Sequence, residues 1–216
     1  SISVNPYTRH IESFTQKSKD RVLQTISFEE IKQIKALRDL PYTLENARKW
    51  ILIGLYIGQR VSDLLALKPS QLRFIENGVY IDINQQKTDK YVTVGVVDKE
   101  VIQILKQRFP YAISAQLFNR QIKQICQIAG IYEMVSGYKL CIKTKRKRLG
   151  THPKYSLISS HDLRRSFATN YFGKIETPIL IQITGHSKES TFLSYIGSQV
   201  NKDTYADAFM KVAATL

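Results

Sequence analysis

Cysteine is scarce in this 216-residue chain, and its two cysteines, Cys126 and Cys141, do not form a CxxC pair. That spacing gives no support to a structural zinc site or a disulfide framework, and it favours a reducing compartment. Long apolar runs are missing as well: none approaches the ~20 residues of a membrane span, and the first residues lack a signal-peptide pattern. We therefore expect a cytoplasmic protein with no part in a membrane.

Acidic residues are few, 18 against 32 lysines and arginines, which gives a formal charge of +14. Such an excess favours a polyanionic partner, because binding releases counterions and long-range attraction speeds the encounter. Charge alone does not separate DNA from RNA or a membrane surface. One acid-free basic run lies in a predicted loop over residues 139–148. This run could contact DNA phosphates, or it could be a solvated charge run or an import-like signal. The candidates for the phosphate contacts are Lys139, Lys143, Lys145, Arg146, Lys147 and Arg148.

Carboxylate clusters and a phosphate-binding P-loop are lacking too. A metal site built from His152, His161 and His186 would need a compact ligand spacing, which these positions do not have. We therefore predict neither a metal ion nor a cofactor.

The hydrophobic pattern predicts an α+β fold that is mostly helical, with one small antiparallel sheet. Ser27 and Glu30 have capping-box spacing, so a helix should begin near Ser27. The strongly apolar segment over residues 44–57, ended by Gly58, indicates a helix through the core. Residues 72–97 alternate with period two around an Asn77-Gly78 turn, which predicts a hairpin. Helical patterning returns over residues 98–108, 116–129, 161–172, 178–184 and 203–213.

The chain divides by composition into a connector and a folded part. Residues 1–25 are polar and carry no periodic pattern, which is typical of a connector. Residues 26–216 have enough apolar content for one substantial core, or for two small lobes that meet near residue 110.

Two arginines stand where they could hold one phosphate. In-line attack on a phosphodiester spreads negative charge over the nonbridging oxygens, and a guanidinium matches those oxygens with two parallel hydrogen bonds. Arg60 follows the predicted helix end at Gly58, while His161 and Arg164 lie three residues apart on one helix face. Lys87 lies at a predicted hairpin tip, from which an ammonium could protonate a leaving oxygen.

A tyrosine near the end of the chain could supply the nucleophile. A free phenol has a pKa of about 10, so attack by Tyr195 requires neighbouring cations or a base. Each of these residues also has an ordinary interpretation: Arg60 could pair with Asp63, His161 could be a partly buried histidine, His186 could cap a helix, Lys87 could be merely exposed, and Tyr195 could pack. Their joint occurrence favours the chemical interpretation.

In sequence order, these elements resemble the catalytic set of tyrosine recombinases, the phage-integrase family. The resemblance rests on Gly58-Gln-Arg60-Val-Ser-Asp63, Lys87-Thr88, His161-x-x-Arg164, Gly185-His186-Ser187 and Tyr195, and it covers roughly residues 27–200. It implies a catalytic domain in which Arg60, Arg164 and His186 bind the scissile phosphate, Lys87 protonates the leaving oxygen, His161 assists proton transfer and Tyr195 forms a 3′-phosphotyrosine. Asp63 would orient an active-site arginine or the nearby backbone.

The resemblance also implies a partner and an assembly: double-stranded DNA, and a homotetramer on that DNA for the full-length protein, with a monomer as the alternative for the isolated domain. Residues 1–25 would then be the linker from a core-binding domain, and residues 26–216 the catalytic domain of an integrase that inserts or excises a mobile element. Whether the tail packs in cis or in trans stays open. A type IB-like topoisomerase and a non-cleaving DNA-binding regulator remain the alternatives. Three positions depart from the family pattern: Thr184 replaces the usual leucine, Arg165 takes a place commonly held by histidine, and Gly197 stands where a histidine often follows the tyrosine.

Overall fold

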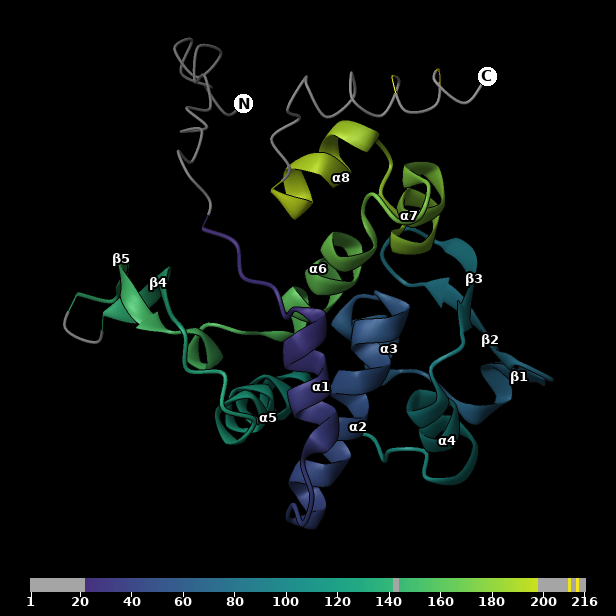
Figure 1. Ribbon diagram of the computed structural model, residues 1–216, viewed down its shortest axis with the longest axis horizontal. Coiled ribbons are helices and arrows are strands. Elements are labelled where there is room, and N and C mark those ends of the chain that lie inside the picture. The colour runs from purple at the N-terminus through teal and green to yellow at the C-terminus, as the bar shows by residue number, and fades with distance from the viewer. Residues whose placement is uncertain (1–21, 142–143, 198–209, 211–212, 214–216) are drawn as a thin grey trace, which may run out of the picture.

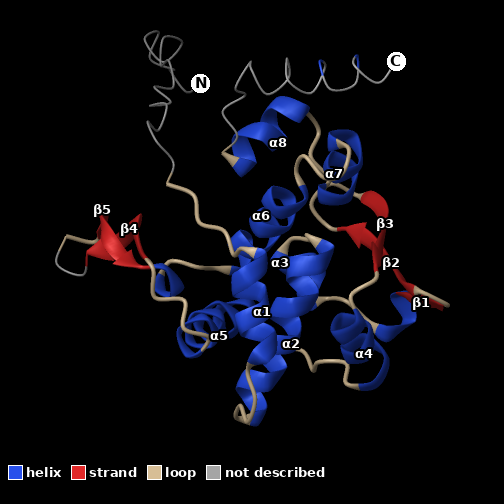
Figure 2. Ribbon diagram, in the orientation of Figure 1, coloured by secondary structure: helices blue, strands red, loops and turns tan. Residues whose placement is uncertain are grey.

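Helices form the centre of the molecule, and two small antiparallel sheets lie on opposite sides of them (Figure 1, Figure 2). The computed structural model describes residues 22–141, 144–197, 210 and 213. Within them the helices are α1 (Phe28–Ala36), α2 (Tyr42–Ile57), α3 (Val61–Leu65), α4 (Lys99–Gln107), α5 (Ala115–Ile128), α6 (Ser160–Tyr171), α7 (Thr177–Thr184) and α8 (Glu189–Ile196), with short 3₁₀ turns at Pro69–Gln71 and Lys154–Ser156. The strands are β1 (Leu72–Ile75), β2 (Gly78–Gln85), β3 (Lys90–Val96), β4 (Met134–Cys141) and β5 (Arg146–Pro153). The predicted mostly helical α+β fold is confirmed.

Helix α2 runs through the core, as its apolar sequence predicts. Its second half from Trp50 is almost wholly buried and joins a hydrophobic cluster that draws on segments before and after residue 110. The helix ends at Gly58, whose left-handed φ of 62° suits a residue without a side chain. A Cβ at Gly58 would also meet the Phe167 ring at 2.3 Å. The sharp ending turns the chain so that Arg60 directly follows the core helix.

The three-stranded sheet confirms the predicted alternation. Val79, Ile81 and Ile83 of β2 face the core and pair across the ladder with Val96, Val94 and Val92 of β3. The first hairpin turns one residue earlier than predicted: Glu76 and Asn77 form the loop, and Gly78 already pairs with Ile75. The second connection, residues 86–89, carries Lys87 at its tip.

The basic segment 139–148 is not a loop, and that prediction is wrong. Strands β4 and β5 pair over eight residue pairs and form a second sheet (Figure 2). A ladder of main-chain hydrogen bonds does not require apolar side chains, so the lysines and arginines did not prevent it. Gly137 lies opposite Gly150, and Leu157 packs where a Cβ on Gly137 would stand. The glycine at position 137 therefore permits this close packing.

Two short helices, α3 and α8, were not predicted, because neither is long enough to show a clear period. Of the connector predicted over residues 1–25, residues 1–21 lie outside the described residues. So does the predicted helix over residues 203–213, apart from Met210 and Ala213, and so do the tail residues Val200, Tyr205, Ala208, Phe209 and Val212.

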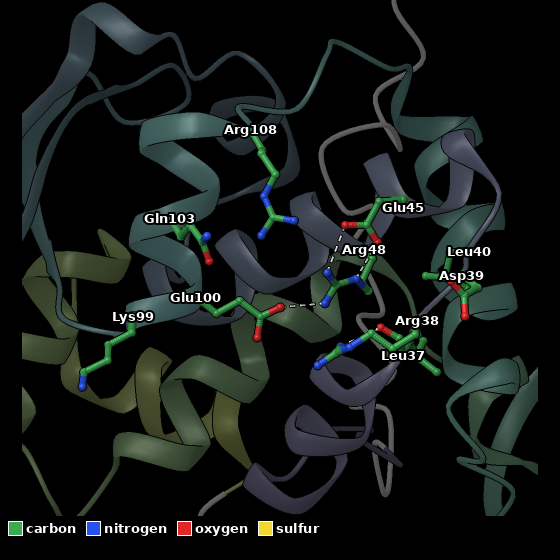
Figure 3. Close-up of a pocket in the computed structure, with 10 residues that line it drawn as sticks. All are labelled: Leu37, Arg38, Asp39, Leu40, Glu45, Arg48, Lys99, Glu100, Gln103 and Arg108. Carbon is green, nitrogen blue, oxygen red and sulfur yellow. Dashed lines mark hydrogen bonds and ion pairs between the residues drawn. The ribbon is translucent and has the colours of Figure 1, made fainter.

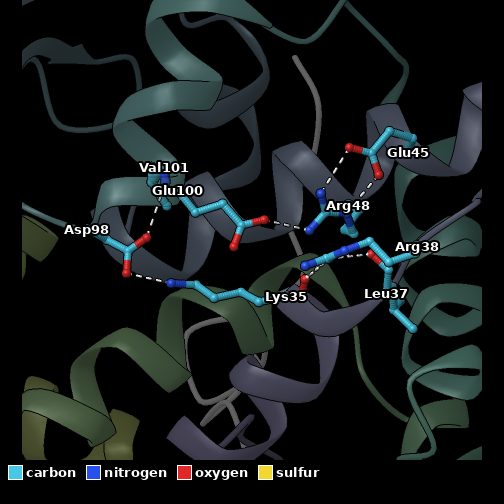
Figure 4. A network of polar contacts seen from close by, with 8 residues as sticks. All are labelled: Lys35, Leu37, Arg38, Glu45, Arg48, Asp98, Glu100 and Val101. Carbon is cyan, nitrogen blue, oxygen red and sulfur yellow. Dashed lines mark hydrogen bonds and ion pairs between the residues drawn. The ribbon is translucent and has the colours of Figure 1, made fainter.

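Ion pairs fasten α1 and α2 to α4 (Figure 4). Arg48 lies between Glu45 at 2.7 Å and Glu100 at 2.8 Å, and it is 4% exposed. Lys35 pairs with Asp98 at 2.5 Å, and Asp98 also caps α4 by accepting from the Val101 N–H. The helices are therefore joined by charges whose partners are all in place.

Candidate active site

A cleft of about 420 Å³ contains all six residues that the sequence predicts to be catalytic. They come from five separate places in the fold: the start of α3, the β2–β3 turn, the start of α6, the loop after α7, and α8. The residues that line the cleft are Arg60, Val61, Ser62, Lys87, Ser160, His161, Arg164, His186 and Tyr195. The fold thus gathers side chains that are up to 135 positions apart in the sequence, from Arg60 to Tyr195.

Arg60 and Lys87 reach the cleft through a shared neighbour. Arg60 precedes the first residue of α3, and its Nη1 donates to Gln85 Oε1 at 3.3 Å. The turn that carries Lys87 closes by hydrogen bonds from the Thr88 and Asp89 N–H groups to the Gln85 carbonyl, at 3.2 and 2.8 Å. Thr88 also donates its hydroxyl to Gln85 Oε1 at 2.9 Å. Gln85 therefore fixes the relative placement of the two cations.

Asp63 orients backbone rather than an arginine. Its Oδ1 accepts from the Gln86 N–H at 3.1 Å, which anchors the start of the Lys87 turn onto α3. Among the described residues no ion pair joins Asp63 to Arg60, so the ordinary interpretation of that pair is not realised. The second oxygen of this buried carboxylate, Oδ2, has no hydrogen-bond partner among the described residues.

Arg164 is deeply buried, at 3% exposure, and it contacts carbonyl groups instead of carboxylates. Its Nη1 donates to the Gly58 carbonyl at 3.1 Å and its Nη2 to the Thr184 carbonyl, so it joins the ends of α2 and α7. Burial lowers the pKa of Arg164 to about 10, and the nearby charge of Arg60 acts in the same direction. Arg164 remains a cation at neutral pH, and its positive charge is not neutralised by an ion pair within the described residues.

Sequence reasoning missed the buried glutamine pair beneath the cleft. Gln85 is fully buried, and its Nε2 donates to Gln59 Oε1 at 2.8 Å and to the Ile183 carbonyl at 3.1 Å. Gln59 donates in turn to the Ile57 and Ile183 carbonyls. Gly185 has a left-handed φ of 64°, and a Cβ there would stand 1.9 Å from Gln85 Oε1. No local pattern marks a glutamine for such a position, since its partners are distant in the sequence.

His186 is held by the threonine that departs from the family pattern. Thr184 Oγ1 donates to the Leu180 carbonyl at 2.6 Å and lies 2.8 Å from His186 Nδ1. Because the hydroxyl proton goes to Leu180, the oxygen accepts from Nδ1–H and leaves Nε2 directed away from the contact. Desolvation, together with Arg164 and Arg60, lowers the pKa of His186 to about 4. The imidazole is therefore neutral in the free protein at neutral pH.

Tyr195 lies between two histidine rings at the end of α8. Its ring centroid is 5.1 Å from that of His161 and 5.0 Å from that of His186, and its hydroxyl donates to the His161 carbonyl at 3.1 Å. Desolvation raises the pKa of the phenol, while the charges of Arg164 and Arg165 oppose that rise. Desolvation and the charge of Arg165 lower the pKa of His161. A neutral imidazole thus lies beside a protonated phenol.

The family model for the phage integrase family matches residues 24–202, which include the whole cleft. This chain belongs to the phage integrase family. No curated protein sequence gives a significant match.

Solved structures of tyrosine recombinases have the same fold. The XerH site-specific recombinase bound to difH substrate is 18% identical, with a TM-score of 0.62 over 88% of this chain and 54% of that chain. A lambda integrase(75-356) dimer bound to a COC′ core site is 17% identical, with a TM-score of 0.60 over 87% and 64%. The XerA recombinase is 18% identical, with a TM-score of 0.53 over 91% and 66%. This integrase-family chain therefore spans less than two thirds of the XerH and lambda integrase chains.

The basic residues of the β4–β5 hairpin lie outside the cleft of this integrase-family chain. Lys145, Arg146, Lys147 and Arg148 are exposed and Lys139 is half-buried, whereas Lys143 lies outside the described residues. None of these five described cations has an ion-pair partner within the described residues. Lys139 and Arg148 stand directly opposite each other in the ladder. Like charges in such a pair repel, so the hairpin carries an unneutralised positive surface.

Another cavity, about 610 Å³ and so larger than the cleft, lies at the opposite end of α2 (Figure 3). Its buried cation is Arg48, which is already paired with Glu45 and Glu100. None of the predicted catalytic residues lines it. Cavity size is therefore no guide to the chemistry of this integrase-family chain.

Within residues 22–141, 144–197, 210 and 213, no group of three or more histidine, cysteine, aspartate or glutamate side chains could hold a metal ion. Over the same residues, no helix has the length and apolar character that crossing a membrane requires.

Proposed function

We propose that this chain is the catalytic part of a site-specific DNA recombinase that cleaves and rejoins DNA through a covalent link to Tyr195. The observation that carries the proposal is the cleft itself. Two arginines, a lysine, two histidines and one tyrosine hydroxyl line about 420 Å³, without a neutralising carboxylate among the residues that line it. Such a set suits an anion with charge on several oxygens, as a phosphodiester acquires during in-line attack.

The proposed first step is a transesterification at phosphorus. The phenol oxygen of Tyr195 forms a bond to phosphorus, the bond to the 5′ oxygen of the following nucleotide breaks, and the phenol proton passes to the neutral imidazole of His161. Lys87 gives a proton to the departing 5′ oxygen, and a 3′-phosphotyrosine remains. The link keeps the energy of the phosphodiester, so a 5′ hydroxyl from a partner strand reverses the step without nucleotide hydrolysis.

Arg60, Arg164 and His186 would stabilise the charge that develops on the nonbridging oxygens. Arg164 uses two of its five N–H donors on carbonyls and also contacts the Tyr195 side chain, which leaves further donors for the phosphate. His186 directs Nε2 away from Thr184, and a bound phosphate would raise its depressed pKa and favour the imidazolium. These interactions are strongest with the transition state, which carries the most charge.

The β4–β5 hairpin would contact the DNA backbone away from the scissile phosphate. The facing cations Lys139 and Arg148 have no acidic partner among the described residues, and phosphate groups would remove their mutual repulsion. We extend the same role to Lys143, Lys145, Arg146 and Lys147. Backbone contacts of this kind fix position without reading base sequence.

We also propose the wider setting that the family suggests. Residues 1–25 would be the connector and residues 26–216 the catalytic domain of an integrase that inserts or excises a mobile element. On its DNA it would assemble as four copies. A lambda integrase tetramer bound to a Holliday junction has a similar fold, with a TM-score of 0.54 and 18% identity.

A covalent-capture assay tests the central proposal. A pool of nicked duplexes with randomised sequence is incubated with the protein in EDTA, and adducts are separated under denaturing conditions and sequenced. The wild type is expected to form a protein–DNA adduct that Tyr195→Phe abolishes. Tyr132→Phe, an exposed tyrosine that does not line the cleft, is the matched control and should behave as the wild type. Adduct formation by Tyr195→Phe at the wild-type rate would refute the assignment of the nucleophile.

A further inference from the structure

Arg165 has no part in the chemistry proposed above, although it follows Arg164 directly. It does not line the cleft, and its side chain is largely buried. The sequence resemblance places a histidine at this position in many family members, so the arginine is a feature of this chain. Burying a guanidinium is costly unless its hydrogen bonds are met. The contacts of Arg165 are therefore informative.

One side of the guanidinium is held by a carboxylate on the same helix. Arg165 Nη1 pairs with Asp162 Oδ1 one turn earlier in α6. The other oxygen of Asp162 accepts from the Ser159 N–H at 2.9 Å and from its hydroxyl at 2.7 Å, which closes the capping box of α6. Because Asp162 is itself fixed at the helix start, it sets the direction of the Arg165 side chain.

The other side of the guanidinium contacts Tyr195. Arg165 Nε donates to the Tyr195 main-chain carbonyl at 3.1 Å, and its Cζ lies 5.0 Å from the centroid of the phenol ring. One side chain thus touches both the backbone and the ring of the proposed nucleophile. The Tyr195 hydroxyl is meanwhile fixed at its far end by the His161 carbonyl.

Helix α8 needs such an anchor because it is short. Its eight residues are too few for a helix that is stable in isolation, so its position depends on tertiary contacts. Phe192 and Ile196 bury its apolar side in a small cluster with Phe167. In the part of the chain that the structure describes, the Arg165 bond is the one hydrogen bond that a side chain outside α8 donates to the α8 main chain.

The guanidinium also contributes to the charge around the phenol. The titratable groups that face Tyr195 are His161, Asp162, Arg164 and Arg165 of α6 and His186 after α7, while Arg60 and Lys87 line the same cleft. Desolvation raises the pKa of Tyr195, and Arg164 and then Arg165 act against that rise. Removing the Arg165 charge would therefore make the phenol harder to ionise.

We propose that Arg165 is a positioning residue for the nucleophile: held by Asp162, it clamps the carbonyl and ring of Tyr195 and so keeps the phenol in the active site of its own chain. The inference rests on the proposed cleavage chemistry. It assigns to this chain an arginine anchor at a position that the family commonly fills with histidine.

The first test compares Arg165→Met, which keeps the length of the side chain without its charge or hydrogen bonds, with the wild type. Adduct formation on the nicked duplexes should slow about 100-fold, since a shift of about 1 Å in a reacting group can cost that much. DNA affinity, measured by fluorescence anisotropy in a Tyr195→Phe background, should stay within about threefold, because Arg165 does not line the cleft. The pH profile of the adduct rate should move to higher pH.

Two further variants exclude a general loss of folding. Arg165→Lys keeps a cation beside Asp162 but loses the planar fork, so it should restore the pH profile and part of the rate. Arg38→Met removes an exposed arginine at the rim of the distant cavity in Figure 3 and should match the wild type. If Arg165→Met does not fold, as judged by circular dichroism, Arg165→Lys carries the test. A wild-type adduct rate in the folded variant overturns the proposal.

A measurement without DNA separates this proposal from the proposed function. In protein labelled with ¹³Cζ-tyrosine, the Tyr195 resonance is identified by its loss in Tyr195→Phe. Arg165→Met should shift that resonance and raise the pH at which it titrates, whether or not the protein cleaves DNA. If the wild type forms no adduct, the proposed function fails while this measurement still reports on the clamp. An unchanged Tyr195 resonance and titration in Arg165→Met overturns the clamp in every case.

Discussion

Two buried arginines at opposite ends of the core helix have similar exposure and opposite surroundings. Arg48, 4% exposed, lies between Glu45 and Glu100, whereas Arg164, 3% exposed, contacts two main-chain carbonyls. Burial alone would lower the pKa of Arg48, yet its two carboxylates raise it, while the pKa of Arg164 falls to about 10. One cation is neutralised within the fold, and the other keeps its charge for a ligand.

This difference separates an arginine that stabilises the fold from one that is available for chemistry. A buried ion pair whose hydrogen bonds are complete resists the removal of either partner. A buried cation without a counter-charge raises the energy of the free protein and gains from an incoming anion. The cleft and the cavity of about 610 Å³ follow the same distinction, because the cavity is lined by the paired Arg48 and the cleft by Arg164, which has no ion-pair partner among the described residues.

The largest expected effect comes from replacing the arginines of the cleft. Arg60→Lys or Arg164→Lys should slow adduct formation about 100- to 1000-fold, because a point charge does not reproduce a planar fork on two phosphate oxygens. For the half-buried Arg60, the free energy of unfolding, measured in urea, should change far less in the lysine variant than it does in Arg48→Met. Near-normal cleavage by either lysine variant would remove the assignment of these residues to the phosphate.

The converse effect is expected at the other end of α2. Arg48→Met should lower the free energy of unfolding by about 2–3 kcal/mol, since it strands two partly buried carboxylates. The folded variant should cleave DNA at the wild-type rate at temperatures well below its melting point. A loss of cleavage without a loss of stability would contradict the comparison.

A smaller effect is expected where the chain departs from the family pattern. Thr184→Val keeps the shape of this fully buried side chain but removes the hydroxyl that fixes His186. Losing that hydrogen bond should slow adduct formation about tenfold, equivalent to about 1.4 kcal/mol. Ser187→Ala is a matched control, because Ser187 does not line the cleft. Equal rates for both variants would show that the hydroxyl has no part in orienting the imidazole.

The smallest expected effect is on the pH dependence of stability. The pKa of His186 is about 4 in the folded protein and near its usual 6.5 when unfolded, so the unfolded state binds more protons in between. Its contribution to stability is therefore complete above pH 6.5 and is lost as pH falls toward 4. His186→Gln should flatten this part of the curve in urea titrations. A bound phosphate ion should have the same effect by raising the pKa of His186. If neither change alters the slope of stability against pH, this role of His186 is refuted.

Local signals in the sequence predicted much of the fold. The capping box of Ser27 and Glu30, the end of α2 at Gly58 and the alternation of Val79, Ile81 and Ile83 depend on near neighbours, and all three are confirmed. The β4–β5 hairpin was missed because its acid-free basic run is typical of a loop. Helices α3 and α8 are too short to show a period.

The site was predictable only in part, for a different reason. Family resemblance selected six residues, and the fold brings them to one cleft, whereas their catalytic roles remain predictions. Gln85, Thr184 and Arg165 hold those residues in place through partners that are distant in the sequence or act by main-chain contact. Such supporting contacts leave no pattern in a single sequence. The residues near Gln85, Thr184 or Arg165 in the sequence do not indicate which distant group the side chain will contact.

The bond pattern of Arg164 has a mechanical consequence. Gly58 belongs to the end of α2 in the large hydrophobic cluster, and Thr184 to the end of α7, whose Leu180 lies in the small cluster that also holds α8. The guanidinium of Arg164 therefore links the two hydrophobic clusters through main-chain hydrogen bonds. A relative movement of the two clusters would break the hydrogen bonds of Arg164. A ligand in the cleft that binds Arg164 therefore also restricts this movement.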